Sequence, residues 1–414
     1  MMSRRFVTML TVCVSQWWAT LLPAQTVLGP EGPRNPDQKQ PPNSVFHYEL
    51  TVTPAAEPSP PLKYSLYPRW NELTPGNSVP MWYRAIPRYG RNNVQLQPML
   101  DNDERWFSEP WDDMPVDEVR TFLSSMTNLL DDARTAAYRE ETKWDLGLRD
   151  LRGPATIAFL LEEFQESRRL ARILSLRIGM NLLEKNFDAA LADMRICLRL
   201  AHDVAEPETL INDLIGIAIT AITFENIRHL IDTPGSPNLY WALSTLPTPL
   251  IDLSPAMQAE MSLPERLFPW LNDPEAVDRT PEQWYELLHE TLQQVAGYLD
   301  ELPDSDSSGT EIDVALLGLV ARGYPTAKRQ LIEAGHAPQD VEALAVGQVV
   351  GLHQKHVYQQ MWQNFEAAST LPYRQAQRRF DQLEKGPERA SQRSEVIPIA
   401  GIILPRNSAK PGMQ

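Results

Sequence analysis

The sequence predicts an all-α protein of stacked antiparallel helical hairpins, with a proline-rich N-terminal leader and at most one short β-ribbon. Three observations support this class. Beyond about residue 74, nearly every amphipathic segment begins at a proline, a residue preferred at the first position of a helix. No alternation of strands and helices, which would predict a parallel sheet, is visible. Residues 210–224 are apolar nearly all the way round, as in a central helix buried by its neighbours.

The N-terminus has the order of a secretory signal. Two arginines precede the apolar run 6–22, and Pro23 and Ala24 follow it. We therefore expect residues 1–24 to be a cleaved signal peptide and the protein to be exported, to the periplasm or another extracytoplasmic space. Because Leu22 stands where a small residue is usual, an uncleaved signal anchor is the alternative.

A proline-rich leader follows the signal. Residues 25–61 contain GPEGPRNPDQKQPPN, which is typical of a flexible or polyproline-like tether. Within and after it, residues 45–52 and 62–67 have the alternation of short strands. They predict a two-stranded ribbon closed by the PAAEPSP turn.

The helical part begins after the leader. We expect a helical domain over 62–303, a C-terminal helical segment over 310–385 and a tail over 386–414, with DSDSSG at 304–309 as the boundary candidate. Thr280 and Gln283 predict a reciprocal capping box. The proline-initiated helices are expected at residues 80–86, 115–140, 154–164, 207–231 and 338–365.

Residues 210–224 are apolar nearly all the way round. About 15 residues are too few to cross a bilayer, so we expect a central helix buried by its neighbours and no membrane span after signal cleavage. Asn212 and Asp213 near its start are interpreted as caps or inter-helix hydrogen-bonding groups, with a functional role as the alternative.

Charge and cysteine content exclude several classes of site. The formal net charge of −16 repels phosphate backbones, and no basic cluster reverses it locally, so no nucleic acid partner is expected. If Cys13 is removed with the signal, Cys197 has no cysteine to pair with. Two cysteines also rule out cysteine-rich zinc or iron–sulfur centres. We expect no cofactor.

One hairpin resembles a known repeat. LLEKNFDAALADMRICLRLA, residues 182–201, is similar to the second half of a tetratricopeptide repeat, with Phe187, Ala190, Met194 and Cys197 at the characteristic positions. The first half departs from that pattern, because Arg177 and Ile178 stand where the repeat has leucine and glycine, and no second copy follows. The resemblance implies antiparallel helical hairpins, without establishing a peptide-binding groove.

A second resemblance covers most of residues 60–380. PGSPNLYWALSTLPTPLIDLSPAMQAE at 234–260, KYSLYPRWNELTPGNSVPMWYRAI at 63–86 and EALAVGQVVGLHQKHVYQQMWQNFEAASTLPYRQA at 342–376 are similar to a family of exported all-helical proteins of planctomycete-type bacteria. The family has no assigned activity, so the resemblance implies export and a helical fold but no site residues. The chain departs by ending after IPIAGIILPRNSAKPGMQ, where longer members continue with another helical segment.

The proline-bracketed stretch PGSPNLYWALSTLPTP, residues 234–249, places two aromatic residues side by side. We expect a packed corner, with Ser236 capping a short helix and Trp241 mostly buried beneath the central helix. The alternative is a binding site in which Tyr240 and Trp241 form an exposed platform and Asn238 supplies a polar group.

Other candidate sites have weaker patterns. His353 and His356 lie three residues apart on one helical face, but no third ligand is evident, so no metal site is expected. The acidic run 101–113 lacks the spacing and glycine of a calcium-binding EF-hand loop, and is interpreted as a solvated loop pinned by its tryptophans. No catalytic signature was found in the sequence, so no catalytic residue is assigned.

These patterns favour a non-enzymatic exported helical scaffold or protein-interaction protein that binds other proteins or envelope components. The competing hypothesis is a hydrolase, or a protein that binds small ligands or glycans, using carboxylates and some of the 11 tryptophans in a cleft between helices. Whether the chain is an enzyme, and its oligomeric state, are left open by the sequence.

Overall fold

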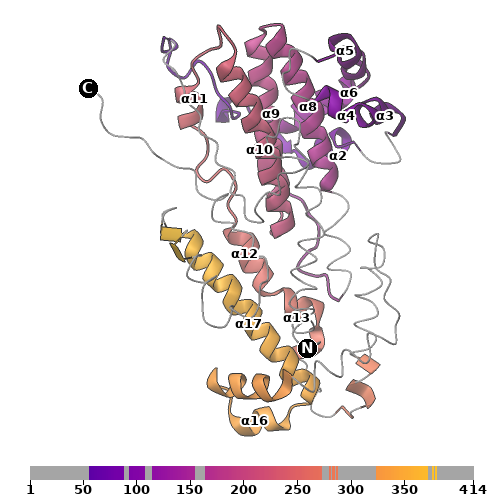
Figure 1. The fold of residues 1–414 in the computed structure, drawn as a ribbon, viewed down its shortest axis with the longest axis vertical. Coiled ribbons are helices and arrows are strands. Elements are labelled where there is room, and N and C mark those ends of the chain that lie inside the picture. Colours follow the sequence, from indigo (N-terminus) through magenta and orange to yellow (C-terminus); the bar gives the residue numbers. More distant parts are fainter. Residues whose placement is uncertain are drawn as a thin grey trace, which may run out of the picture. The chain divides into compact units, whose positions relative to one another are not determined.

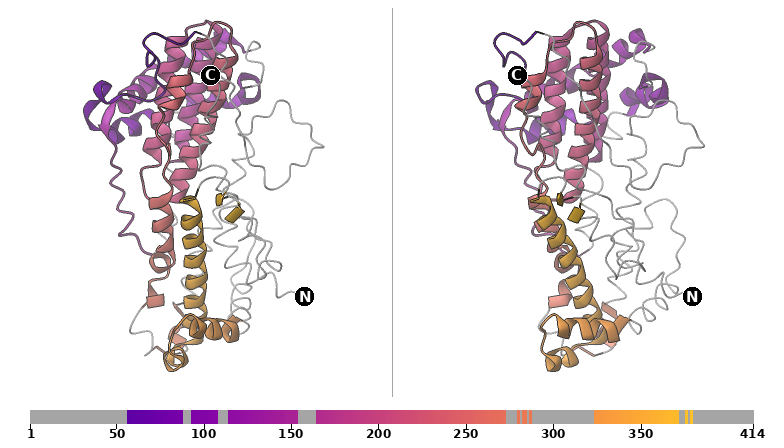
Figure 2. Two further views of the ribbon diagram at one scale, coloured as in Figure 1. Left: turned by 90° about the vertical axis from the view of Figure 1, so that its left-hand side faces the viewer. Right: turned by 60° about the vertical axis from the view of Figure 1, so that its left-hand side comes forward.

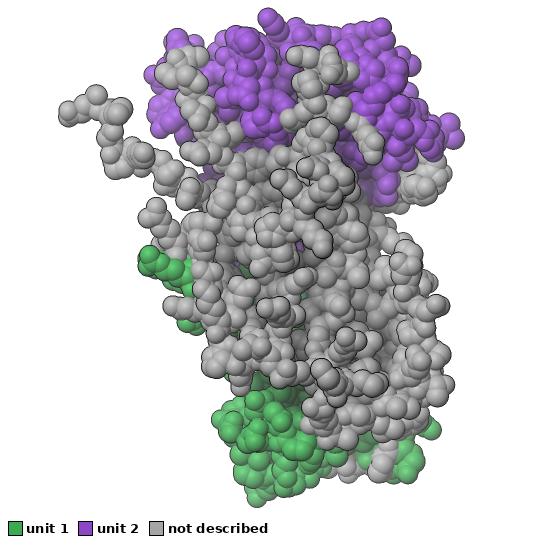
Figure 3. Space-filling model, in the orientation of Figure 1, with its two compact units in different colours: residues 1–24, 147–161, 257–396 green, residues 25–146, 162–256, 397–414 purple. Residues whose placement is uncertain are grey.

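The fold was analysed in a computed structural model. The structure describes residues 56–87, 93–107, 114–153, 164–272, 279–280, 282–284, 286–287, 323–371, 375–376 and 378–379. Over these residues the chain is predominantly helical, and its helices pack against one another, as the sequence predicts (Figure 1). Contacts divide the chain into two compact units (Figure 3). Unit 1 comprises 1–24, 147–161 and 257–396, and unit 2 comprises 25–146, 162–256 and 397–414.

Three long helices form the centre of unit 2. They are α8 (Gln165–Leu183), α9 (Phe187–Val204) and α10 (Leu210–Asp232). Figure 2 shows them packed side by side from two further directions. The turn between α8 and α9 is short because Lys185 adopts a left-handed conformation with φ of 58°, and the Asn186 amide donates to the Asn181 carbonyl at 2.7 Å. The predicted helical hairpin is therefore present.

Helix α10 is longer than the predicted apolar stretch, because it continues eight residues beyond Phe224 to Asp232. Among the described residues it is the one helix long and apolar enough to cross a membrane, by length and composition. The same composition suits a core helix. One of its faces is buried and carries the polar residues Asn212, Asp213, Thr223 and Asn226, which suits packing against α8 and α9.

A glycine permits close contact between α9 and α10. A β-carbon built on Gly216 would lie 2.6 Å from the Ala201 carbonyl oxygen and 2.8 Å from a methyl carbon of Ile251. Both positions are closer than van der Waals contact allows, so only glycine fits here without a shift of the helices.

The start of α10 is fixed by side chains. Thr209, the N-cap residue, accepts from the Asn212 amide at 3.2 Å, and the Asn212 side chain donates to the Val204 carbonyl at 2.9 Å. The structural interpretation of Asn212 is thus supported, because its side chain links the end of α9 to the first turn of α10. The helix begins at Leu210, three residues after the proline that the sequence predicted as its start.

Shorter elements surround the three helices of unit 2. They are η2 (Trp70–Glu72), β1 (Thr74–Asn77), α2 (Val79–Ala85), α3 (Asn93–Asp101), α4 (Asp103–Trp106), α5 (Val116–Ser125), α6 (Thr127–Ala137), β2 (Arg139–Glu141) and α11 (Tyr240–Ser244). The segment predicted as one helix from Pro115 is divided at Met126 into α5 and α6, and its last residues form β2.

The predicted β-ribbon is not the one observed. Residues 62–67 form turns and bends rather than a strand, and residues 45–52 lie outside the described part of the chain. The structure instead pairs β1 with β2 in parallel, with Thr74 opposite Arg139. The alternation of a few residues did not predict the strands correctly, because a pair of strands this short is stabilised by specific side-chain contacts. One of them is the side chain of Asn77, which donates to the Lys143 carbonyl at 2.9 Å.

Unit 1 contains α13 (Leu263–Leu267), η4 (Pro269–Asn272), α16 (Pro338–Ala343) and α17 (Val346–Ser369), and it shares α12 (Ser254–Met261) with unit 2. A small core joins α16 and α17 to residues 323–334. Its buried members are Ala327, Leu331, Val341, Val349 and Val350.

Two predictions about unit 1 can be assessed. The helix predicted from Pro338 is interrupted at Leu344 and Ala345, which are extended, so α16 and α17 are separate. The capping box is confirmed, because the Thr280 amide donates to Gln283 Oε1 at 2.9 Å and the Gln283 amide to Thr280 Oγ1 at 3.4 Å. Residues 1–55, 154–163, 304–309 and 380–414 lie outside the described residues, so the signal, most of the leader, one helix, the boundary loop and the tail stay predictions.

Candidate functional site

The aromatic pair of the PNLYWAL stretch lies at the surface of unit 2. Tyr240 is 52% exposed and Trp241 is 37% exposed, so the prediction that Trp241 is mostly buried is wrong. Their rings meet edge to face, with centroids 5.1 Å apart and planes at 85°. This arrangement is favourable for two aromatic rings and keeps both at the protein surface.

The position of the helix start explains this exposure. Helix α11 begins at Tyr240, and Asn238, rather than Ser236, accepts from its first amide, at 2.8 Å from the Tyr240 nitrogen. Leu239 and Ala242 are buried and anchor the segment to the core. With these two residues facing inward, Tyr240 and Trp241 face outward. Of the three predicted binding residues, Asn238 shapes the backbone and the two aromatics form the surface.

Trp241 contacts one further polar group. Its indole Nε1 donates to Glu57, far away in the sequence. Figure 1 shows the beginning of the described chain next to α11. We call Tyr240, Trp241 and Glu57 the α11 platform. It combines an aromatic surface with a carboxylate, a combination the sequence did not reveal because residue 57 lies in the leader.

A buried polar cluster on α9 was also missed in the sequence. Asp203 is fully buried and accepts from the Trp82 indole at 2.8 Å, while its backbone carbonyl accepts from the Trp144 indole at 2.6 Å. Arg199, one turn earlier, lies 2.7 Å from the same carboxylate. Arg199 and Asp203, four residues apart on a largely apolar helix, were the only signal the sequence offered.

This cluster binds secondary-structure elements together. Arg199 also donates to the Arg139 carbonyl at 3.1 Å, and so connects α9 to β2. His202 Nδ1 lies 3.3 Å from Asp203, which is the orientation of a carboxylate–histidine pair. Among the described residues, Asp203 is the one hydrogen-bonding partner of the His202 imidazole. The partners of Asp203 are structural ones, and we interpret the cluster as an anchor.

A second buried carboxylate joins α8 to α9. Asp193 contacts the Arg177 guanidinium through both oxygens and accepts from Asn181 at 3.3 Å. Burial raises the pKa of the Asp193 carboxyl, and Arg177 opposes that rise. Arg177 is one of the two residues that depart from the tetratricopeptide pattern, and here it forms an ion pair between α8 and α9.

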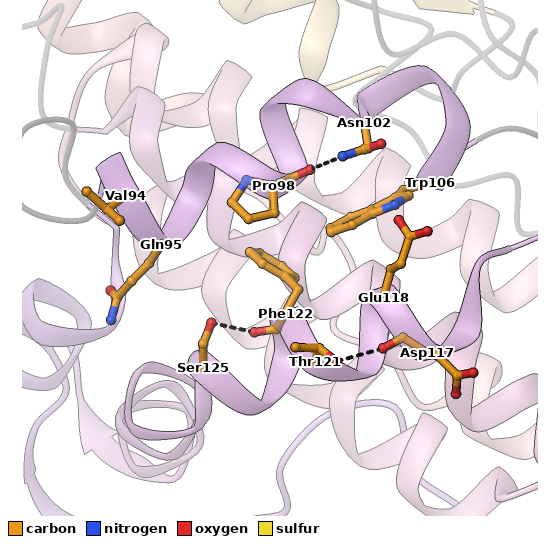
Figure 4. A pocket seen from close by; sticks show the side chains of 10 residues that line it. All are labelled: Val94, Gln95, Pro98, Asn102, Trp106, Asp117, Glu118, Thr121, Phe122 and Ser125. Atoms are coloured by element: carbon orange, nitrogen blue, oxygen red, sulfur yellow. Dashed lines mark hydrogen bonds between the residues drawn. The ribbon is translucent and has the colours of Figure 1, made fainter.

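An open groove lies among α3, α4 and α5 (Figure 4). Its volume is about 670 Å³, within the range of ligand-binding clefts. Trp106 and Phe122 form its aromatic part, with ring centroids 5.3 Å apart. The other lining residues are Val94, Gln95, Pro98, Asn102, Asp117, Glu118, Thr121 and Ser125.

The groove includes part of the acidic run that was interpreted as a loop. Residues 101–107 are mostly helical and not a solvated loop, and Trp106 is only 3% exposed. Residues 108–113 lie outside the described residues. The carboxylates of Asp117 and Glu118 are exposed and paired with Arg120 and Arg105, respectively. Both carboxylates therefore lie at the protein surface and not in an apolar enclosure.

The predicted histidine pair lies on α17. His353 contacts the side chain of Gln330, in the helical segment 323–333 that precedes α16, which gives it a structural hydrogen-bonding partner. Within the part of the chain that the structure describes, no group of three or more histidine, cysteine, aspartate or glutamate side chains is arranged to hold a metal ion.

Comparison with known proteins found no matching family model, no matching curated protein and no matching solved structure. The similarity to exported planctomycete-type proteins and to a tetratricopeptide repeat therefore stays a hypothesis from the sequence.

Proposed function

We propose that this protein is an exported, non-enzymatic helical binding protein and that the α11 platform binds a protein or another envelope component. The observation that supports it is the exposure of two adjacent aromatic side chains on a segment fixed by buried neighbours. Large aromatic residues left at a surface are typical of binding sites, because their burial on contact contributes strongly to affinity.

Fixation of the platform adds to this argument. Leu239 is fully buried and Ala242 is 2% exposed, so the backbone that carries the aromatics is held by the core. A rigid platform loses little conformational entropy on binding. Export follows from the signal-like residues 1–24 and stands as part of the proposal.

The experiment compares Trp241→Ala with the parent in a pull-down from envelope extract of the source cells. We expect loss of a reproducible partner together with a small change in melting temperature. A buried tryptophan would cost about 3–5 kcal/mol on truncation, whereas a surface tryptophan costs far less. Val357→Ala, at a 42% exposed residue of α17, is the control for general surface stickiness.

Three outcomes would contradict the proposal. If Trp241→Ala melts far below the parent, Trp241 has a structural role. If the stable variant keeps every partner of the parent, or if Val357→Ala loses the same partner, the α11 platform is not the binding site.

The Trp241–Glu57 contact favours a second candidate, a glycan ligand at the same platform. Sugars stack on aromatic faces and donate hydroxyl hydrogen bonds to carboxylates. Titration of tryptophan fluorescence with soluble cell-wall oligosaccharides tests it. Saturable binding that Glu57→Gln weakens would favour the glycan over a protein partner, and an unchanged signal would exclude it.

A further inference from the structure

The groove among α3, α4 and α5 contains a buried hydrogen-bond donor with no acceptor. Trp106 is 3% exposed, and within the described part of the chain its indole Nε1 has no hydrogen-bonding partner. Buried donors are nearly always satisfied in folded proteins, so each exception calls for an explanation. An acceptor supplied by a bound molecule would satisfy this donor, since Trp106 lines the groove (Figure 4).

The rim of the groove offers mainly acceptors. Thr121 and Ser125 use their hydroxyl hydrogens on backbone carbonyls, at 2.8 Å and 2.6 Å. Asn102 donates its amide to the Pro98 carbonyl at 2.8 Å. The oxygens of these three side chains keep lone pairs for a ligand. A matching ligand therefore brings hydrogen-bond donors to the rim and an acceptor to Trp106.

Charge narrows the class of ligand. Helices α3, α4 and α5 carry five carboxylates and two arginines, and the whole chain has a net charge of −16. The carboxylate of Asp117 is 99% exposed and lies on the rim. A cationic group is favoured there both by the local charge and by the field of the whole protein.

We propose that this groove binds a lysine- or arginine-bearing segment of a partner polypeptide in an extended conformation. Such a segment carries both required chemistries, because its main-chain carbonyls accept hydrogen bonds and its side chains end in cations. A carbonyl accepts from Trp106, and the cationic side chains of the ligand compete with Arg120 and Arg105 for Asp117 and Glu118. The groove shares no residue with the α11 platform, and this inference does not depend on that site.

The test uses the full chain and a fluorescently labelled decapeptide of alternating lysine and alanine, followed by anisotropy. We expect the double variant Asp117→Asn/Glu118→Gln to weaken binding at least about tenfold, because both carboxylates face the cations. Asp131→Asn/Asp188→Asn removes the same charge from exposed sites on α6 and α9 and is the matched control, with an expected change below about twofold.

Trp106→Phe tests the indole donor. It keeps an aromatic ring against Phe122 and removes only the hydrogen-bonding edge of the larger ring, and we expect binding about fivefold weaker. Circular dichroism and melting temperature report whether the variant folds. If it does not fold, the binding measured with Asp117→Asn/Glu118→Gln alone tests the proposal.

Several results would overturn the proposal. They are no binding of the lysine–alanine peptide, an equal loss in the control double variant, or equally tight binding of a glutamate–alanine peptide. Binding of spermine that is as tight and equally sensitive to the groove variants would indicate a site for small cations instead. Trp241→Ala is expected to bind the peptide like the parent, so failure of the α11 platform and failure of the groove are distinguishable.

Discussion

At the scale of single residues, Asp203 has several buried polar contacts within unit 2. Trp82 on α2, Trp144 in the segment after β2 and one arginine contact its carboxylate or its backbone carbonyl. Removing one partner from such a cluster leaves a buried charge unpaired, which lowers the free energy of unfolding. The side chain of Tyr67 closes this cluster, with its ring 5.9 Å from that of His202.

Tyr67 makes the folded state sensitive to alkali. Burial raises the pKa of Tyr67 to about 12, although Arg199 opposes the rise. The unfolded chain releases the phenol proton near pH 10, whereas the folded protein keeps it to about pH 12. Over that window the unfolded state binds fewer protons, so the free energy of unfolding falls as pH rises.

As pH rises from about 10 to about 12, the free energy of unfolding is therefore expected to fall less for Tyr67→Phe than for the parent. Urea unfolding at successive pH values measures the effect. Tyr240→Phe, at an exposed tyrosine, is the control and should follow the parent curve. Parallel curves for Tyr67→Phe and the parent would contradict the prediction.

The sequence identified few of these residues. Tyr240 and Trp241 were singled out as the alternative binding site, but Trp241 was expected to be mostly buried. That expectation failed because a shift of a few residues in a helix start rotates every side chain around the helix axis. Glu57 and Trp82 could not be found at all, since their partners lie more than a hundred residues away. Long-range contacts of this kind leave no periodic signal.

At the scale of elements, the contact between α9 and α10 depends on Gly216. Gly216→Ala would place a methyl group against the Ala201 carbonyl, and we expect a loss of about 1–3 kcal/mol in the free energy of unfolding, despite the better helix propensity of alanine. Thermal and urea unfolding measure it.

Gly323→Ala is the matched control for this substitution. Its added β-carbon would lie 3.8 Å from Val350, an ordinary contact, so no comparable loss is expected. A Gly216→Ala variant as stable as the parent would show that the two helices separate easily, against the packing described above.

Prolines predicted where helices begin better than where they end. The helix near Pro80 and the long helix α10 are present, but the breaks at Met126 and at Leu344 were missed. Neither break has the glycine or proline that usually marks a helix end. The breaks separate α5 from α6 and α16 from α17. Because local propensity does not predict these breaks, we attribute them to tertiary packing.

At the scale of the whole molecule, the all-α class was predictable because helical periodicity recurs along most of the chain. The division of the chain into two units was not predictable. The sequence suggested a helical domain over 62–303 and a C-terminal helical segment over 310–385, whereas contacts in the structure group 147–161 with 257–396. A segment that leaves one unit and returns to it later produces no change in composition.

Export is also a property of the whole chain. We expect the mature protein to begin at Gln25, because residues 1–24 have the order of a cleaved signal. Mass spectrometry of the protein from an extracytoplasmic fraction measures this. An intact N-terminus in the membrane fraction would indicate the signal anchor, and an intact N-terminus in the cytoplasm would contradict export.

The buried thiol on α9 can report how often the core of unit 2 opens. Cys197 is fully buried, and its pKa is raised by that burial, so the folded state offers almost no thiolate to an alkylating reagent. It is the one cysteine among the described residues. Each alkylation at Cys197 must then follow an opening of the α8–α9–α10 packing. The rate of labelling, followed over hours, counts those openings without any change to the sequence.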